Sequence, residues 1–150
     1  MLYREFACIL VFPIWSVVDA QCMDGWVRYE NSCYGIGDET VTWGGAQEMC
    51  QLFDSSLAEV ESSDENGFLK EIARNHSYAA VWLGGTDVFS EGRWIWVGSR
   101  KLIESGFSDW YPGEPNAQNG EDCLQLYRNE HYQWNDNACE STAVFFCETQ

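Results

Sequence analysis

The sequence predicts a single α+β domain, with two helices in its first half and a strand-rich second half. Apolar residues recur at helical spacing in two segments before residue 75. After that point they fall in short β-branched and aromatic runs separated by turn residues. At 150 residues, the chain has the length of one domain.

The first twenty residues have the pattern of a secretory signal. Arg4 supplies a positive charge, residues 6–18 form a short apolar run, and residues 18–20 place small side chains where a signal peptidase cuts. A membrane anchor is the alternative, but the run is shorter than the about 20 apolar residues that span a bilayer. We therefore expect residues 1–20 to be removed and a secreted, extracellular domain without a membrane anchor to occupy residues 21–150.

Removal of the signal leaves six of the seven cysteines, because Cys8 lies within it. An even set in a small secreted domain is typical of a disulfide framework, although sequence alone leaves every pairing open. Zinc is the competing interpretation, but there is no CxxC pair and the only histidines are His76 and His131. The six cysteines are Cys22, Cys33, Cys50, Cys123, Cys139 and Cys147.

The first elements expected are a hairpin and a helix. Strand-type residues between 22 and 36 surround a turn signal at residues 30–32. The helix should begin at Thr42 and bury one face of its apolar residues. That face would contain Trp43, Ala46, Met49, Cys50 and Phe53.

The second helix has a capping box, with Ser62 as the cap and Glu65 three residues later. A short strand is expected before it, at residues 57–60. The apolar stripe of the helix falls at helical spacing and should face the core. The stripe consists of Phe68, Leu69, Ile72 and Ala73.

The remaining strands are short, and a long loop interrupts them. The stretch between residues 98 and 121 is rich in Gly, Ser, Pro, Asn and acids, and it has no apolar periodicity. A loop of this length in a small domain is either functional or disordered, and its aromatic residues favour order. The expected strands span residues 79–83, 93–97, 124–127, 132–134 and 143–147.

Six side chains with hard oxygen atoms lie in and between a Glu-Pro-Asn motif and a Trp-Asn-Asp motif. Two of the six are carboxamides and four are carboxylates, a mixture that suits Ca²⁺, which takes about six to eight oxygen ligands. An ion on an open rim could share its remaining positions with a polyhydroxyl ligand. The sequence therefore predicts calcium-mediated sugar binding. The six residues are Glu114, Asn116, Glu121, Asp122, Asn135 and Asp136.

The chain is strongly acidic, with a net charge of −16. Solubility accounts for most of this charge, while some carboxylates would be clustered as metal ligands. Nucleic acid is excluded as a partner because no basic patch is present to bind phosphates.

Taken together, these features resemble the C-type lectin domain over residues 22–148. Residues 82–85, Trp-Leu-Gly-Gly, are similar to the family's Trp-Ile-Gly-Leu signature, with Gly85 in place of the last apolar residue. The order of the cysteines matches the family framework. The resemblance implies a fold of two helices, two small antiparallel sheets and a long calcium-binding loop region. It also implies three disulfides, namely Cys22–Cys33, Cys50–Cys147 and Cys123–Cys139.

The resemblance also assigns roles to the oxygen-bearing residues. One principal Ca²⁺ would be held by five side chains, which would also bind the sugar, and Pro115 would be cis. The Glu-Pro-Asn order goes with mannose-type sugars, namely mannose, N-acetylglucosamine, glucose and fucose. The five residues are Glu114, Asn116, Glu121, Asn135 and Asp136.

A second, auxiliary Ca²⁺ site is implied at Asp87, Glu91 and Asp122, with help from Glu121. Ala117 stands where family members often have another carboxylate. The auxiliary site is therefore expected to be weaker or empty.

The favoured function is that of a secreted, calcium-dependent lectin that takes part in innate immune recognition of microbes. The alternative is a protein-binding or ice-binding module of the same fold in which calcium is only structural. The chain is not expected to be an enzyme, because it has neither a nucleophile elbow nor an HExxH motif. Asn75 begins a glycosylation sequon, and no oligomerisation element is recognisable.

Overall fold

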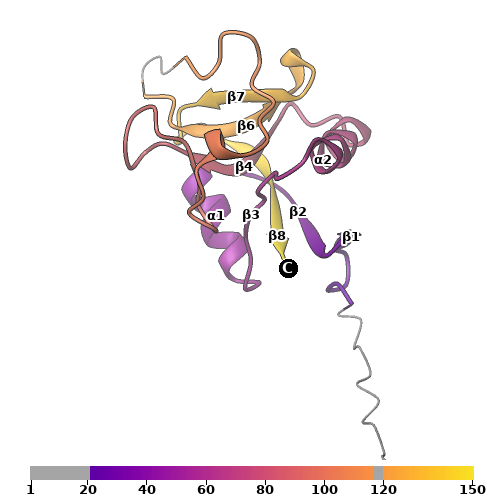
Figure 1. Ribbon diagram of the computed structural model, residues 1–150. Helices are drawn as coiled ribbons and strands as arrows, with labels where there is room; N and C mark the ends of the chain where they lie inside the picture. Colours follow the sequence, from indigo (N-terminus) through magenta and orange to yellow (C-terminus); the bar gives the residue numbers. More distant parts are fainter. Residues whose placement is uncertain (1–20, 117–119) are drawn as a thin grey trace, which may run out of the picture.

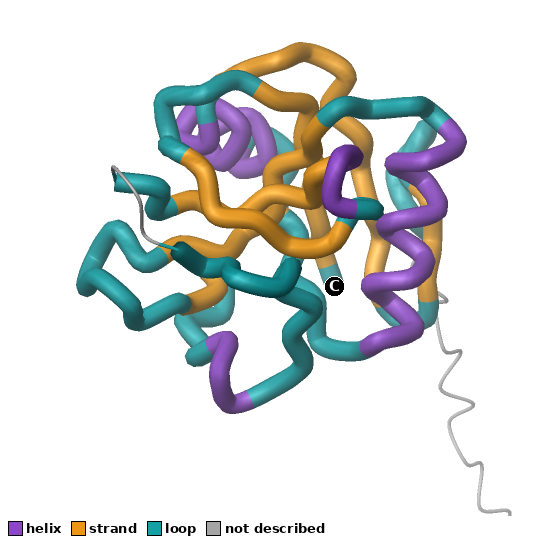
Figure 2. Tube along the Cα trace, turned by 90° about the horizontal axis from the view of Figure 1, so that it is seen from above, coloured by secondary structure: helices purple, strands orange, loops and turns teal. Residues whose placement is uncertain are grey.

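The structure is a computed structural model that describes residues 21–116 and 120–150. Two predictions lie outside these residues, namely the signal at residues 1–20 and the missing carboxylate at Ala117. In the described chain, two helices lie on opposite sides of a set of strands (Figures 1 and 2). The helices are α1 (Trp43–Gln51) and α2 (Ser63–Asn75), with short 3-10 turns η1 (Ile103–Ser105) and η2 (Arg128–Glu130). The strands are β1 (Val27–Tyr29), β2 (Ser32–Val41), β3 (Ser56–Leu57), β4 (Ala80–Thr86), β5 (Ile95–Trp96), β6 (Cys123–Tyr127), β7 (Gln133–Asn137) and β8 (Ala143–Thr149).

The α+β class is confirmed, and the expected two antiparallel sheets are joined into one mixed sheet. The order is β1-β2-β8-β4-β6-β7, with β3 beside β8 and β5 beside β4. All pairs are antiparallel except β4 and β8, which run parallel in the register Val81↔Val144 and Trp82↔Phe145. This central pair is well buried on both faces, as is usual for parallel strands. The result places β6 and β7 at one edge, where the long loop meets them (Figure 1).

Helix α1 starts where its sequence predicts but ends earlier. Thr42 is the N-cap, and its Oγ1 accepts a hydrogen bond from the Gly45 N–H at 3.2 Å. Trp43 and Cys50 are buried as expected. The expectation that Phe53 is buried is wrong, because its side chain is 51% exposed. The helix stops at Gln51 and the chain turns, so Phe53 leaves the apolar face of the helix.

Helix α2 confirms the cap at Ser62, whose Oγ accepts from the Glu65 N–H at 3.2 Å. The other half of the capping box differs from expectation. The Glu65 carboxylate reaches one residue further back and accepts from the Glu61 N–H at 2.7 Å, and it also accepts from the Tyr34 hydroxyl. Leu69 and the rest of the predicted stripe face the core.

Gly85 stands where the family signature has a larger apolar residue, and the structure gives a packing reason. A Cβ at this position would lie 2.7 Å from Leu124 Cδ1, closer than such carbon atoms approach. The Leu124 side chain on β6 therefore fills this space. Trp82 in the same strand and Trp134 on β7 are fully buried.

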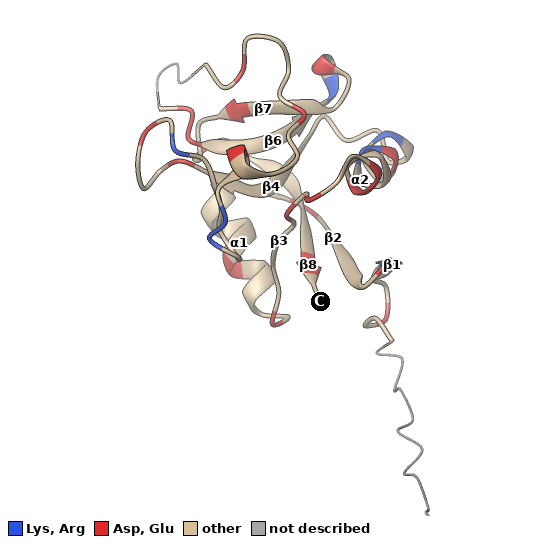
Figure 3. Cartoon of the chain, viewed as in Figure 1, with Lys and Arg blue, Asp and Glu red and all other residues tan. Residues whose placement is uncertain are grey.

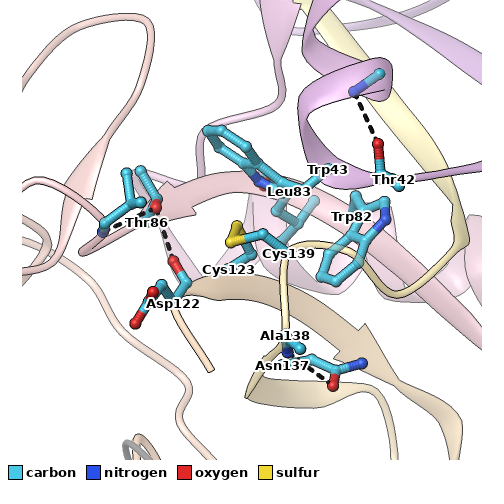
Figure 4. Close-up of a disulfide and its surroundings, with 12 residues drawn as sticks. Thr42, Trp43, Trp82, Leu83, Thr86, Asp122, Cys123, Asn137, Ala138 and Cys139 are labelled. Carbon is cyan, nitrogen blue, oxygen red and sulfur yellow. Dashed lines mark hydrogen bonds between the residues drawn. A yellow bond between two sulfur atoms is a disulfide. The ribbon is translucent and has the colours of Figure 1, made fainter. Parts of the chain in front are cut away.

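All three implied disulfides are present, namely Cys22–Cys33, Cys50–Cys147 and Cys123–Cys139. The third lies against Trp82 and joins the start of β6 to the chain just after β7 (Figure 4). It therefore ties together the two strand ends nearest to the predicted ligands. No helix among the described residues is long and apolar enough to cross a membrane.

Candidate functional site

Strand β7 positions two of the predicted ligands at the edge of the sheet. Asn135 pairs with Gln125, and Asp136 pairs with Leu124 on β6. Successive side chains on a strand point to opposite faces, so Asp136 is 1% exposed whereas Asn135 is only partly buried. The Asn135 side chain nevertheless turns back, and its Nδ2 donates to the main-chain oxygen of Asp136 at 2.6 Å. This bond holds the Asn135 carboxamide beside the main-chain oxygen of Asp136.

The long loop brings the Glu-Pro-Asn motif onto β7. A turn is closed by the Glu114 N–H donating to the Tyr111 carbonyl at 2.8 Å, and the Glu114–Pro115 bond is cis, as the resemblance implied. The Asn116 N–H then donates to Asp136 Oδ2 at 3.0 Å. The Asn116 Nδ2 donates to Glu114 Oε2 at 2.6 Å. Four of the five predicted principal ligands are thus connected by hydrogen bonds.

Glu121, the fifth predicted ligand, lies just before β6. It lies two residues before Cys123, the first residue of that strand, and Cys123 pairs with Asn137 next to Asp136. Burial raises the pKa of Glu121, and the charge of Asp136 raises it further. The two carboxylates therefore disfavour each other's ionisation.

Crowding of negative groups dominates the electrostatics of this site. The pKa of Glu114 is raised to about 7, first by burial and then by its hydrogen bond and charge interaction with Asp136. Neighbouring carboxylates repel one another when both are ionised, and a bound cation relieves this repulsion. The oxygen-rich, nitrogen-poor donor set suits a hard ion such as Ca²⁺. The residues present therefore fit the predicted ion.

The auxiliary cluster is also assembled. One carboxylate oxygen each from Asp87, Glu91 and Asp122 lies within 4.8 Å of the other two. Asp87 is 2% exposed; its Oδ2 accepts from the Gly92 N–H at 2.8 Å, while its Oδ1 is buried and has no hydrogen-bond partner among the described residues. Burial raises the pKa of Asp87, and the charges of Glu91 and Asp122 add to this effect.

The loop that carries Asp87 is fixed to Asp122, the residue directly before β6. The Thr86 hydroxyl donates to the Asp122 carbonyl at 2.7 Å (Figure 4). The Asp87 N–H donates to the same oxygen at 3.2 Å. Asp122 directly follows Glu121, so the principal and auxiliary groups are neighbours.

Glu130 near the site was missed by sequence reasoning. It ends η2, and its Oε2 is buried without a hydrogen-bond partner among the described residues. Burial raises the pKa of Glu130, and the charge of Asp136 raises it further. Asp and Glu occur on the loops around β6 and β7 as well as elsewhere on the surface (Figure 3), so composition alone does not single out this residue.

The family model described as Lectin C-type domain matches residues 39–149, which include every predicted calcium ligand. The chain belongs to the C-type lectin family. Domains of this family generally bind Ca²⁺ and glycans and are generally not enzymes. The family assignment therefore agrees with the oxygen-rich site at β7.

Individual relatives support the assignment over most of the chain. Perlucin from Haliotis laevigata is 33% identical over 132 residues, covering 86% of this chain and 83% of the relative. The carbohydrate-recognition domain of a mouse scavenger receptor C-type lectin superposes with a TM-score of 0.79 at 26% identity, covering 87% of this chain and 98% of that domain. A Ca²⁺-dependent type II antifreeze protein in its Ca²⁺-free form gives a TM-score of 0.78 at 27% identity, covering 86% and 100%.

Proposed function

We propose that this C-type lectin is a secreted protein that binds mannose-type sugars through a Ca²⁺ ion at the β7 edge. One chain of hydrogen bonds supports the proposal. It runs from Glu114 through Asn116 to Asp136, which also binds Asn135. Oxygen atoms from two distant segments converge there on a partly exposed rim. A role in innate immune recognition of microbes is the proposed setting.

Five residues would hold the principal ion. Glu114, Glu121 and Asp136 would contribute negative charge, while Asn116 and Asn135 would contribute neutral oxygens. When bound, the ion supplies open coordination positions for sugar hydroxyls and withdraws charge from them. Glu114, whose pKa is raised to about 7, must be ionised to hold the ion, so binding would release a proton near neutral pH.

Sugar selectivity follows from which side chains donate and which accept. The Glu114 carboxylate only accepts hydrogen bonds, whereas the Asn116 carboxamide can also donate. A vicinal diol held between them would donate one hydrogen to Glu114 and accept one from Asn116, with the carboxylate bond strengthened by charge. This Glu-then-Asn order favours the equatorial 3- and 4-hydroxyls of mannose, N-acetylglucosamine and glucose, and the equatorial 2- and 3-hydroxyls of fucose present a similar diol.

The auxiliary carboxylates would bind a second Ca²⁺ more weakly than the principal set. Glu91 is exposed, and Ala117 supplies no carboxylate. Protein sites in extracellular modules span about 10⁻⁴–10⁻³ M, which is the range proposed for this second ion.

The competing function is ice or protein binding with calcium in a structural role. Because the chain is similar to a Ca²⁺-dependent antifreeze protein, the experiment must distinguish this function from sugar binding. Calcium dependence alone does not separate the two functions, since the antifreeze protein is also Ca²⁺-dependent by its description. Competition by a free monosaccharide does separate them.

The test is a glycan array with calcium and with chelator, using the secreted protein and two isosteric variants. Wild-type protein should bind mannose-type glycans only with calcium, and free mannose should compete. Asp136→Asn should weaken glycan binding strongly when calcium is limiting, whereas Glu39→Gln, an exposed charge change on β2, should not. Binding that persists in chelator, or thermal hysteresis without any glycan binding, would overturn the proposal.

A further inference from the structure

We propose that Asp109 is a positioning residue for the calcium and sugar site. Its carboxylate, held from helix α2, fixes the base of the loop that carries Glu114 and Asn116. This inference rests on the proposed function, and it concerns a residue that touches neither predicted ion nor sugar.

The Asp109 carboxylate is bound by three side chains from two elements. Its Oδ2 accepts from Asn66 Nδ2 at 2.8 Å and from Lys70 Nζ at 2.7 Å, both on α2. Its Oδ1 accepts from Gln133 Nε2 at 3.1 Å, at the start of β7. Both oxygens therefore have hydrogen-bond partners, and the loop is joined to a helix that lies 43 and 39 residues earlier in the chain.

The backbone on either side of Asp109 continues this attachment along β7. The Trp134 N–H donates to the Asp109 carbonyl at 2.9 Å, and the Tyr111 N–H donates to the Trp134 carbonyl at 2.9 Å. Trp110 forms a parallel bridge to Trp134 between them. Residues 109–111 therefore pair with β7 at Trp134 like a short extra strand. Trp134 is the residue directly before the predicted ligands Asn135 and Asp136.

From this base the loop reaches the ligands by short steps. The Glu114 N–H binds the Tyr111 carbonyl at 2.8 Å, and the Asn116 N–H binds Asp136 Oδ2 at 3.0 Å. Glu114 thus lies between two attachments, one at residues 109–111 and one at Asn116. A shift of the first attachment moves Glu114 relative to Asp136, which changes how well both can hold one ion.

The partners of the Asp109 carboxylate on α2 are largely buried. Asn66 is 5% exposed, and the Lys70 and Asp109 side chains are 13% and 21% exposed. Asn66 is fixed at both ends of its carboxamide, because its Oδ1 also accepts from the indole Nε1–H of the fully buried Trp134 at 3.0 Å. A buried acceptor left without its partners costs far more than an exposed one. Asp109 therefore has one strongly preferred position.

A general stability role is the simpler explanation, and a matched variant separates it from positioning. Tyr34 also makes a buried hydrogen bond to α2, to Glu65, but it lies on β2, far along the sheet order from β7. Tyr34→Phe removes that bond and leaves the loop base untouched. It should lower the melting temperature without changing calcium affinity.

The experiment compares Asp109→Ala, Asp109→Asn and Tyr34→Phe with the wild type, using calcium titration without sugar. Asp109→Ala should raise the Kd for Ca²⁺ about tenfold, the usual effect of losing a residue that supports metal ligands. Asp109→Asn should give a smaller rise and provides the test where Asp109→Ala does not fold. At saturating calcium the sugar affinity should return to within about twofold of the wild type, because the ion then holds the loop.

Amide exchange in the calcium-free protein gives a second readout. The amides of Tyr111 and Trp134 should exchange faster in Asp109→Ala and at the wild-type rate in Tyr34→Phe. Equal calcium affinities in all variants, or equal losses in Asp109→Ala and Tyr34→Phe, would overturn the proposal. A wild type that binds calcium but no glycan overturns only the proposed function, whereas one that binds no calcium overturns both.

Discussion

The backbone N–H of Asn116 donates to Oδ2 of Asp136 at 3.0 Å, joining a loop and a strand that are 20 residues apart in sequence. This bond holds the loop with the Glu-Pro-Asn motif against β7, the two segments that carry most of the predicted calcium ligands, without any ion. It also aligns Asp136, which is 1% exposed, with the rim formed by the loop. The ligand geometry is therefore built by protein contacts, and an ion would add to it.

Asp136→Asn should raise the Kd for Ca²⁺ by about tenfold or more, because ligand charge sets affinity in oxygen-ligand sites. The change keeps the size of the side chain and removes one negative charge at the buried centre of the ligand set. Isothermal titration calorimetry without sugar measures the effect. Glu39→Gln, which removes an exposed charge on β2, is the matched control and should bind calcium like the wild type.

Glu114→Gln combined with Asn116→Asp should move sugar preference from mannose to galactose while calcium binding is retained. The pair exchanges the acceptor and the donor on the rim without changing the number of carboxylates, so the diol that fits must change. Competition by free mannose and free galactose against an immobilised glycan measures the preference. An unchanged preference in a variant that still binds calcium would count against the donor and acceptor account.

Much of this site could be predicted because its information is local. Glu114 and Asn116 flank Pro115, Asn135 and Asp136 are adjacent, and short motifs of this kind are readable in sequence. The same holds for the cap at Ser62, which needs only residues within one turn of the helix.

The rest depends on contacts between distant segments. The parallel β4–β8 pair that joins the two antiparallel groups connects residues more than sixty positions apart, Val81 and Val144, and no local pattern marks it. The role of Asp109 arises only when α2, the loop and β7 are packed together. Phe53 was misplaced because helical spacing does not show where a helix ends.

Calcium-free protein should become less stable as pH rises from about 5 to about 8. The pKa of Glu114 is raised to about 7 from 4.5 in the folded chain. A raised folded-state pKa gives stability that is fully present below the unfolded value and is lost as pH rises through the folded value. The pKa values of Glu121 and Glu130 are raised too, so they act in the same direction.

Melting temperatures across this pH range, in protein freed of metal, measure the effect, and Glu114→Gln is the control. This variant cannot titrate at position 114, so its melting temperature should fall less with pH than that of the wild type. Saturating calcium should also reduce the dependence, since a bound ion stabilises the ionised carboxylates. A wild-type melting temperature that rises with pH more steeply than that of Glu114→Gln would contradict the prediction.

Glu130→Gln should change stability and calcium affinity in opposite directions. The Glu130 Oε2 is buried without a hydrogen-bond partner among the described residues, and Asp136 raises the pKa of this carboxyl. A neutral amide should therefore stabilise the calcium-free protein at neutral pH. Removal of a nearby negative charge that is not a predicted ligand should weaken calcium binding by about fivefold or less, as expected for a charge acting at several Å through a partly aqueous medium.

Salt separates this long-range effect from a role for Glu130 as a ligand. Added salt screens charges that act at a distance, so the difference in Kd between the wild type and Glu130→Gln should shrink between about 0.01 M and 1 M ionic strength. A direct ligand would keep its difference, because coordination bonds are little screened. Glu39→Gln should match the wild type at every salt concentration. A loss of calcium affinity in Glu130→Gln as large as that in Asp136→Asn would instead place Glu130 among the ligands.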